Sequence, residues 1–287
     1  MKEMKFIAVS DLHGRISRYE KLFELIRDEQ PDAVFIAGDL TQGFYRIHLG
    51  EDIEGFILKY LRDDLQKLKD EMQENYPAIF VIMGNDDPRL LEEAVQKLDA
   101  DGLWNYVHNR RIEWKGYHIS GYAYVPPTPF QMKDWEKFDI SRFVDVGAIA
   151  PDGGFRTVEA DPLELEWGTI KRDLEKLYAD ENLAYDICIF HSPPYKTQLD
   201  RAALDGKMID YAPLDVHIGS IAIKEFIQKR QPLLTLHGHV HESTRITGNW
   251  QENINKTLMF NCANDGDELA VIRINTKDIG LAKRSLI

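Results

Sequence analysis

The chain has 287 residues, of which 44% are hydrophobic and 29% charged, the composition of an ordinary globular protein and not of a disordered one. Its net charge of −13 argues against a nucleic-acid partner, because binding to a phosphate backbone is driven by Lys and Arg. The sequence contains no run of about 18 apolar residues, which excludes a predicted transmembrane helix.

The first hundred residues alternate between strand-like and helix-like stretches. Short apolar runs predict strands at 6–9, 33–37 and 78–83. Apolar residues at helical spacing predict helices around 19–26 and over 56–72, and Pro88 opens a third helix over 88–98. Strands separated by helices imply parallel crossover units, so the fold class is α/β.

The pattern becomes less regular after this point. A hairpin is predicted from strands at 112–114 and 117–120, and no regular structure is predicted for most of 122–168 and 193–219. The remaining elements are helices at 169–178 and 220–229 and strands at 186–190, 233–236, 258–262 and 269–274. We therefore expect one domain over 1–287 with irregular insertions at 122–168 and 193–219. The first insertion is expected to pack against this domain, with a lid or a dimer surface as alternatives.

Five of the predicted strands end in loops that carry side chains able to bind metal ions. These side chains are Asp11, His13, Asp39, Asn85, His191, His239 and His241. Taken alone, each loop is more often a turn, a helix cap or a histidine bonded to backbone than a metal site. His239 and His241 are the strongest pair, because alternate residues of an extended chain point the same way. Since ligands of open α/β sheets collect beyond the carboxyl ends of the strands, the five loops are expected to converge.

The number and kind of these side chains predict two metal ions. Seven ligands exceed what one ion takes while it keeps an open position, and the carboxylate of Asp39 can bridge two ions. Imidazole and carboxylate ligands without thiolates favour Mn²⁺, with Fe, Zn²⁺, Ni²⁺ or Mg²⁺ as alternatives. Two ions roughly 3.5–4 Å apart form the clamp used for in-line displacement at phosphorus.

In this order, the five motifs resemble those of the calcineurin-like metallophosphoesterase superfamily. The resemblance extends from the first motif at Asp11 to the last at His241, and it implies a four-layer α/β/β/α sandwich of two mixed sheets flanked by helices. It also implies a first ion held by Asp11, His13 and His241. It implies that Asp39 bridges to a second ion held by Asn85, His191 and His239, and that a metal-bound hydroxide attacks the phosphorus.

One position departs from the family pattern. Most members have a histidine directly after the motif asparagine, where it stabilises or protonates the departing oxygen, whereas this chain has Asp86 after Asn85. An aspartate with its ordinary pKa is ionised at neutral pH and repels a phosphate. Asp86 is therefore a candidate catalytic position of altered chemistry. We expect a preference for phosphodiesters with good leaving groups, such as aryl esters.

The favoured function is thus a dinuclear metal-dependent phosphoesterase that hydrolyses small phosphate esters, with phosphodiesters preferred. Candidate substrate-binding residues are Asn85 and His217, although His217 also fits an ordinary surface loop. A nuclease of the same superfamily and a non-catalytic nucleotide or phosphate sensor are the alternatives. The apolar stretch at 6–9 is too short for a secretory signal, so we expect a cytoplasmic protein without membrane contact. A homo-oligomer is compatible with the sequence.

Overall fold

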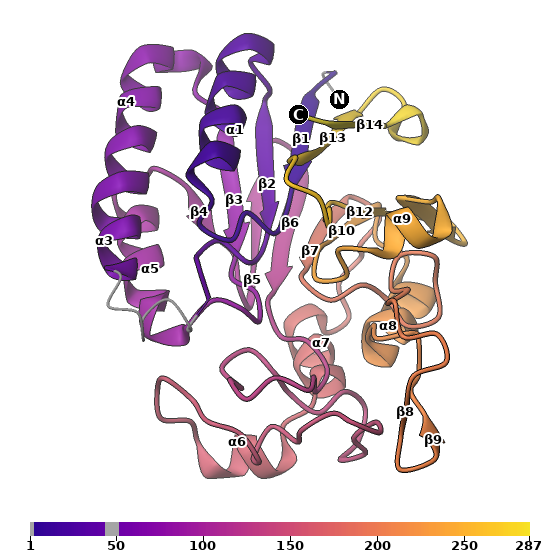
Figure 1. Ribbon diagram of the computed structural model, residues 1–287. Helices are drawn as coiled ribbons and strands as arrows, with labels where there is room; N and C mark the ends of the chain where they lie inside the picture. Colours follow the sequence, from indigo (N-terminus) through magenta and orange to yellow (C-terminus); the bar gives the residue numbers. More distant parts are fainter. Residues whose placement is uncertain (1–2, 44–51) are drawn as a thin grey trace.

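The computed structural model describes residues 3–43 and 52–287 of the chain (Figure 1). Two six-stranded mixed sheets pack against each other, and helices lie on the outer face of each sheet. This is the α/β/β/α arrangement that the resemblance implies, so the predicted fold class is confirmed. Among the residues in these two ranges, none of the helices has the length and apolar content needed to span a bilayer.

The first sheet contains the three strands predicted near the N-terminus. In spatial order its strands are β14 (Lys283–Leu286), β13 (Ala270–Asn275), β1 (Lys5–Val9), β2 (Ala33–Ala37), β3 (Ala78–Ile82) and β4 (Asn105–Tyr106). Strands β1 to β4 are parallel, and β13 runs antiparallel to β1. All five residues of β2 are buried, as expected of a strand covered on both faces.

The second sheet has the same plan, with a parallel centre and antiparallel edges. In spatial order its strands are β11 (Gln251–Ile254), β12 (Thr257–Asn261), β10 (Leu234–His237), β7 (Asp186–Phe190), β6 (Tyr117–Tyr122) and β5 (Arg110–Trp114). Strands β12, β10, β7 and β6 are parallel, whereas β11 and β5 pair antiparallel at the edges. The layer between the sheets is apolar and includes Phe35 and Phe80 from the first sheet and Ile189 and Leu236 from the second.

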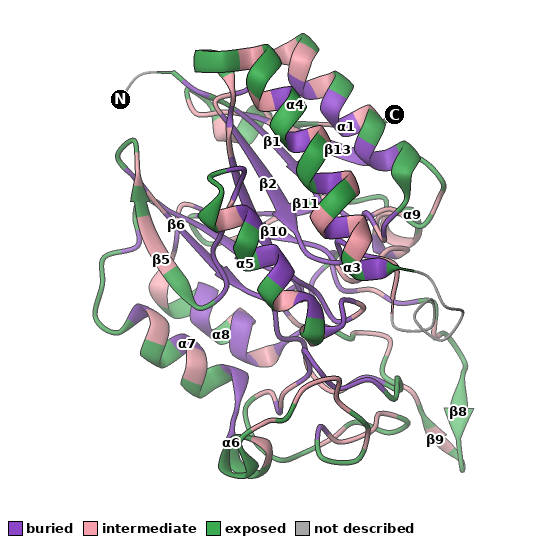
Figure 2. Ribbon diagram, turned by 90° about the vertical axis from the view of Figure 1, so that its left-hand side faces the viewer, coloured by how far each residue is buried: buried purple, intermediate pink, exposed green. Residues whose placement is uncertain are grey.

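Helices cover both outer faces of the sandwich (Figure 1). On the first sheet these are α1 (Ile16–Glu29), α3 (Ile53–Gly55), α4 (Arg62–Met72) and α5 (Glu92–Ala100). The second sheet carries α7 (Ile170–Tyr178) and α8 (Ile221–Arg230). The helix predicted over 56–72 begins with a π-helical turn, Phe56–Leu61, before α4. Figure 2 shows that α1, α4 and α5 are buried on the side facing the sheet and exposed on the other.

The two stretches predicted to be irregular lie at the lower end of the sandwich in Figure 1. The first contains one short helix, α6 (Pro162–Trp167), and the second contains a small hairpin, β8 (Met208–Ile209) with β9 (Ala212–Pro213). Three aromatic side chains of the first stretch beyond β6 are buried, namely Tyr124, Trp135 and Phe138. The part of this stretch that contains them therefore packs against the sandwich.

The elements that the sequence did not predict are short or polar. They include β4, β11, β14, the hairpin β8–β9, and the helices α3, α6 and α9 (Ser243–Thr247). Strands β11 and β14 lie at sheet edges, have partly exposed residues and contain no apolar run, so the signal used for the central strands is missing from them.

Candidate metal centre

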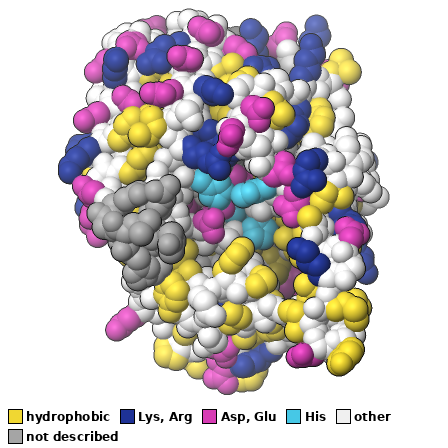
Figure 3. Space-filling model, in the orientation of Figure 1, with side chains coloured by type: hydrophobic (Ala, Val, Ile, Leu, Met, Phe, Trp, Pro, Cys, Tyr) yellow, Lys and Arg dark blue, Asp and Glu magenta, His cyan; other side chains and the backbone are white. Residues whose placement is uncertain are grey.

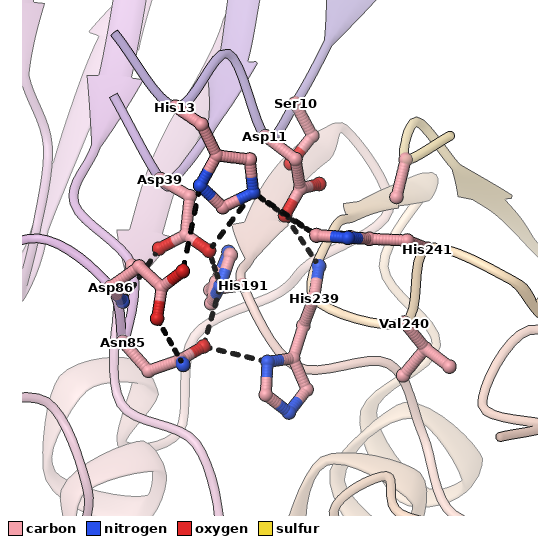
Figure 4. A network of polar contacts seen from close by, with 12 residues as sticks. Ser10, Asp11, His13, Asp39, Asn85, Asp86, His191, His239, Val240 and His241 are labelled. Carbon is pink, nitrogen blue, oxygen red and sulfur yellow. Dashed lines mark hydrogen bonds and ion pairs between the residues drawn. The ribbon is translucent and has the colours of Figure 1, made fainter. Parts of the chain in front are cut away.

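The seven predicted ligand side chains lie together in the structure (Figure 4). They follow the ends of β1, β2, β3, β7 and β10, and they are Asp11, His13, Asp39, Asn85, His191, His239 and His241. The first four come from the first sheet and the last three from the second. The prediction placed all of them above one sheet edge, but two sheets contribute, because face-to-face packing sets β7 beside β2.

The backbone of these loops bends sharply at several of the predicted ligand residues. Asp11, His13, Asp39 and His239 have φ values of 55°, 50°, 52° and 70°, in the left-handed region that residues other than glycine rarely adopt. Residues with such strained conformations cluster at functional sites, where the surrounding structure holds them in place. Gly84 has a different role. A Cβ there would collide with Oδ1 of Asp39, so the motif needs glycine for this close approach.

A first group consists of Asp11, His13, Asp39 and His241, each of which offers a ligand atom within 4.8 Å of the others. Nε2 of His241 lies 3.0 Å from Oδ1 of Asp11 and 3.2 Å from Nε2 of His13. Oδ2 of Asp11 is buried and has no hydrogen-bond partner among the described parts of the chain. Two carboxylates and two ring nitrogens that face one point, with one buried oxygen unpaired, fit a divalent cation.

A second group consists of Asn85, His191 and His239, which meet at the Asn85 side chain. Oδ1 of Asn85 lies 3.0 Å from Nε2 of His191 and 2.6 Å from Nδ1 of His239. Asp39 lies between the two groups, since its Oδ2 is 3.4 Å from Nε2 of His191 and 3.9 Å from Nε2 of His13. One carboxylate that faces two sets of possible ligands fits a pair of neighbouring ions.

The buried carboxylates make this spot electrostatically favourable for positive charge. Burial alone lowers the pKa of His191, but the charges of Asp39 and Asp11 outweigh it and raise that pKa to about 10. In the same way, Asp11 overcomes the burial of His241 and raises its pKa to about 9. A divalent cation would supply the positive charge that these carboxylates stabilise.

Hydrogen bonds with the surrounding backbone orient the predicted ligand residues. Nδ1 of His191 lies 2.7 Å from the carbonyl oxygen of Ala37, which directs Nε2 toward Asn85. The backbone N–H of Asp86 donates to Oδ1 of Asp39 at 2.9 Å. His237, by contrast, is fully buried and lies 3.0 Å from the carbonyl oxygen of Ser192, so it packs behind the site.

Asp87 connects the loop after β2 to the loop after β3, a structural role that the sequence did not predict. Its carboxylate accepts hydrogen bonds from the backbone N–H groups of Leu40, Thr41 and Gly84, at 3.0, 2.7 and 2.9 Å. Burial, and next the charge of Asp39, raise the pKa of Asp87 to about 6. The sequence showed a second acidic residue after the motif asparagine but not the two loops that it connects.

Asp86, at the position of the usual histidine, turns its carboxylate toward a ligand. Oδ2 of Asp86 lies 3.5 Å from Nδ1 of His13, and Oδ1 lies 3.4 Å from Nδ2 of Asn85. Its side chain is 45% exposed. Partial burial and the nearby charge of Asp39 raise its pKa to about 6.

A cleft of about 420 Å³ opens beside the two groups. Its floor includes Asp39, Asn85, Asp86, His239 and His241. Its walls come from both irregular stretches and contain Pro126, Pro127, Thr128, Pro129, Phe130, Leu214 and His217. Among the described residues that line it, none is Lys or Arg. Figure 3 shows histidine side chains gathered in this hollow, with hydrophobic side chains along its lower rim.

Comparison with known proteins agrees with this geometry. The family model of the calcineurin-like phosphoesterases matches residues 4–243. One crystal structure has 19% sequence identity and a TM-score of 0.61, with 99% of each chain covered. The crystal structure of TT1561 from Thermus thermophilus has 16% identity and a TM-score of 0.58, again with 99% of each chain covered. These two likenesses show a shared fold.

No curated protein sequence matches the chain. The family match nevertheless extends over most of the chain and includes all seven ligand positions, from Asp11 to His241. The chain therefore belongs to the calcineurin-like phosphoesterase family.

Proposed function

We propose that this protein is a dinuclear metal-dependent phosphodiesterase that acts on small molecules. The observation that carries the proposal is the position of Asp39, whose carboxylate faces both groups of ligands at the floor of one cleft. We propose Asp11, His13 and His241 as ligands of one ion. We propose Asn85, His191 and His239 as ligands of the other, with Mn²⁺ as the preferred metal.

When bound, the two ions supply charge stabilisation for the phosphoryl oxygens and lower the pKa of a water molecule. The protein's own groups position the ester. Nδ2 of Asn85 makes one long hydrogen bond, to Asp86, so it has capacity to donate to a phosphoryl oxygen. His217 lies on the cleft wall and is the second residue proposed to contact substrate.

The charge of the cleft favours diesters over monoesters. Besides Asp39, its described lining contains the carboxylates of Asp86, Asp145, Asp215 and Glu242 and no Lys or Arg. A phosphodiester has one negative charge at neutral pH, whereas a monoester approaches two, and repulsion by carboxylates increases with the charge of the ligand. The same shortage of cations argues against long nucleic acids, which are bound through Lys and Arg.

The ester groups of the substrate would contact apolar walls. Pro126, Phe130 and Leu214 line the cleft above the ligand groups and offer surface to an aryl or alkyl substituent. These walls support a preference for aryl phosphodiesters. Hydrolysis of bis(p-nitrophenyl) phosphate should therefore exceed that of dialkyl phosphates.

A screen of metals against substrates tests the proposal. The chain is stripped with a chelator, reloaded with Mn²⁺ or another divalent ion, and assayed with p-nitrophenyl phosphate, bis(p-nitrophenyl) phosphate and nucleotides. We expect metal-dependent turnover of the diester that is lost in Asp39→Ala and retained in Asp63→Ala, a change of an exposed aspartate on α4. Tight binding of a nucleotide or phosphate without turnover of any ester would instead identify a sensor.

A further inference from the structure

Asp200 and His217 form a hydrogen-bonded pair on the cleft wall. Nδ1 of His217 lies 2.7 Å from Oδ1 of Asp200, which is completely buried. The backbone N–H groups of Lys196, Thr197 and Gly219 donate to the same carboxylate at 2.9, 3.0 and 3.2 Å. A carboxylate surrounded by donors acts as the acceptor toward the imidazole too, so Nδ1 of His217 carries the hydrogen.

This leaves Nε2 of His217 as the ring nitrogen that can reach a ligand. Nε2 has no hydrogen-bond partner within residues 3–43 and 52–287, and 25% of the side chain is exposed. The ring lines the cleft whose floor contains Asp39, Asn85 and His239. A histidine fixed through Nδ1 by a buried carboxylate, with Nε2 open to a cleft, has the geometry of a proton donor or acceptor.

The surroundings hold the ring in this position. The backbone N–H of His217 donates to Oδ1 of Asp215 at 2.9 Å. The ring of Tyr195 stands edge-on to the imidazole, with centroids 6.2 Å apart. The chain pairs with Arg201 through an isolated antiparallel bridge, and the Arg201 guanidinium turns away to Asp205. Asp200, Asp215, Tyr195 and Arg201 thus surround His217, and the charges of Lys196 and Asp145 act on Asp215 and Tyr195 beside it.

We infer that His217 protonates the departing ester oxygen, with Asp200 as its positioning residue. The inference rests on the proposed phosphodiesterase function and adds a general acid to its active site. Asp86 occupies the place after Asn85 and its carboxylate is directed at His13. Among the described lining residues, His217 is the cleft histidine outside the two ligand groups. His217 therefore supplies the proton for the leaving group, although it lies in a different segment of the chain from Asp86.

The step balances without a further reactant. The oxygen of the attacking water forms a bond to phosphorus while the bond to the departing ester oxygen breaks, and the electron pair of that bond stays on the ester oxygen. The proton on Nε2 of His217 moves to this oxygen, which departs as an alcohol or phenol. The water's proton passes to solvent, and His217 regains a proton from solvent.

His217→Asn tests the inference, because the asparagine Nδ2–H₂ can replace Nδ1–H in the bond to Asp200 while Nε2 is lost. Chain loaded with Mn²⁺ is assayed on methyl phosphodiesters of p-nitrophenol and of phenol, which differ in leaving-group quality. We expect kcat/KM to fall on the order of 100-fold for the phenyl ester and less than about 5-fold for the p-nitrophenyl ester, since general acids contribute most to poor leaving groups. His118→Asn, on β6, is the matched control, with unchanged kcat/KM for both esters.

A second readout is independent of turnover. Nitrogen NMR of histidine-labelled, metal-free protein should show the Nδ1–H tautomer for the His217 ring when it is neutral, with protonation occurring at Nε2. The opposite tautomer would overturn the inference. The inference would also be overturned if the wild type hydrolysed both esters and the His217→Asn variant kept the same ratio of kcat/KM between them. If the wild type hydrolyses neither ester with any metal, the proposed function itself is wrong.

Discussion

Oδ2 of Asp86 lies 3.5 Å from Nδ1 of His13, while Nε2 of the same ring lies 3.2 Å from Nε2 of His241. The residue that replaces the family's usual histidine thus contacts a proposed metal ligand on the side of the ring away from the metal position. A carboxylate in this place favours one orientation of the imidazole and would increase its basicity as a ligand.

Asp86→Asn should therefore weaken metal binding. Loss of such an outer partner costs about 10–100-fold in metal affinity. Calorimetric titration of chelator-stripped protein with Mn²⁺ measures the change for the site that includes His13. Asp145→Asn, a change on the cleft wall away from His13, should keep the wild-type affinity. Equal affinities for Asp86→Asn and the wild type would show that Asp86 does not support the ligand.

Gly84→Ala should disturb both groups of ligands at once. The new Cβ would lie against Oδ1 of Asp39 and 2.7 Å from Cε1 of His191, so one of them must move. Overpacking of this kind costs about 1–3 kcal/mol in the free energy of unfolding, and the displaced ligands weaken Mn²⁺ binding as well. Urea denaturation of metal-free protein and Mn²⁺ titration measure the two effects separately.

The control for this change is Gly280→Ala, where the nearest atom to a new Cβ is 3.4 Å away. It should leave both the free energy of unfolding and the Mn²⁺ affinity close to those of the wild type. Unchanged Mn²⁺ affinity in Gly84→Ala would contradict the close approach on which the site depends.

The proposed ligands could be predicted as a group because each one lies shortly after the end of an apolar strand. Asp11, Asp39 and Asn85 follow three strands of the first sheet, so they need only the rule that parallel strands end at a common edge, together with the order of the motifs. That rule does not reveal how two sheets pack, so the contribution of both sheets to one site became visible only in the structure.

The cleft walls were not predictable for a different reason. Residues 122–168 and 193–219 have no hydrophobic period, and their positions depend on individual tertiary bonds. Asp200 is an example. In the sequence it is one more charged residue in an irregular stretch. Its role follows from the hydrogen bonds that it accepts from three backbone amides and from its contact with His217, 17 positions later.

A buried ion pair holds one cleft wall in place. Nζ of Lys133 lies 2.6 Å from Oε2 of Glu136 and donates to the carbonyl oxygen of Thr128 at 2.8 Å. Glu136 accepts the backbone N–H of Thr128 at 2.7 Å. Lys133→Met leaves a buried carboxylate without its partner and should cost about 3–5 kcal/mol in the free energy of unfolding.

The double variant Lys133→Met/Glu136→Gln should lose less free energy of unfolding than the two single variants together. Each single change leaves the other group buried without its partner. Urea denaturation of all four proteins gives the coupling free energy. Strict additivity would show that the two side chains do not act as a pair.

The buried His108 should make the protein sensitive to acid. Its Nδ1 accepts the backbone N–H of Ala123 at 3.0 Å, and its ring lies 4.9 Å from that of Trp135. Burial, and next the charges of Arg89 and Lys137, lower its pKa from 6.5 to about 3. Between these values the unfolded chain binds a proton that the folded protein does not, so the free energy of unfolding falls as the pH falls through this window.

His108→Asn removes this titration and keeps an acceptor for the Ala123 amide. The variant loses aromatic packing and should be less stable than the wild type at neutral pH. Between pH 6.5 and 4.5, however, the wild type should lose more free energy of unfolding than the variant, by up to about 2 kcal/mol. Urea denaturation in chelator across this range measures both slopes. All other histidines are the same in the two proteins, so parallel slopes would mean that His108 is not held neutral by its surroundings.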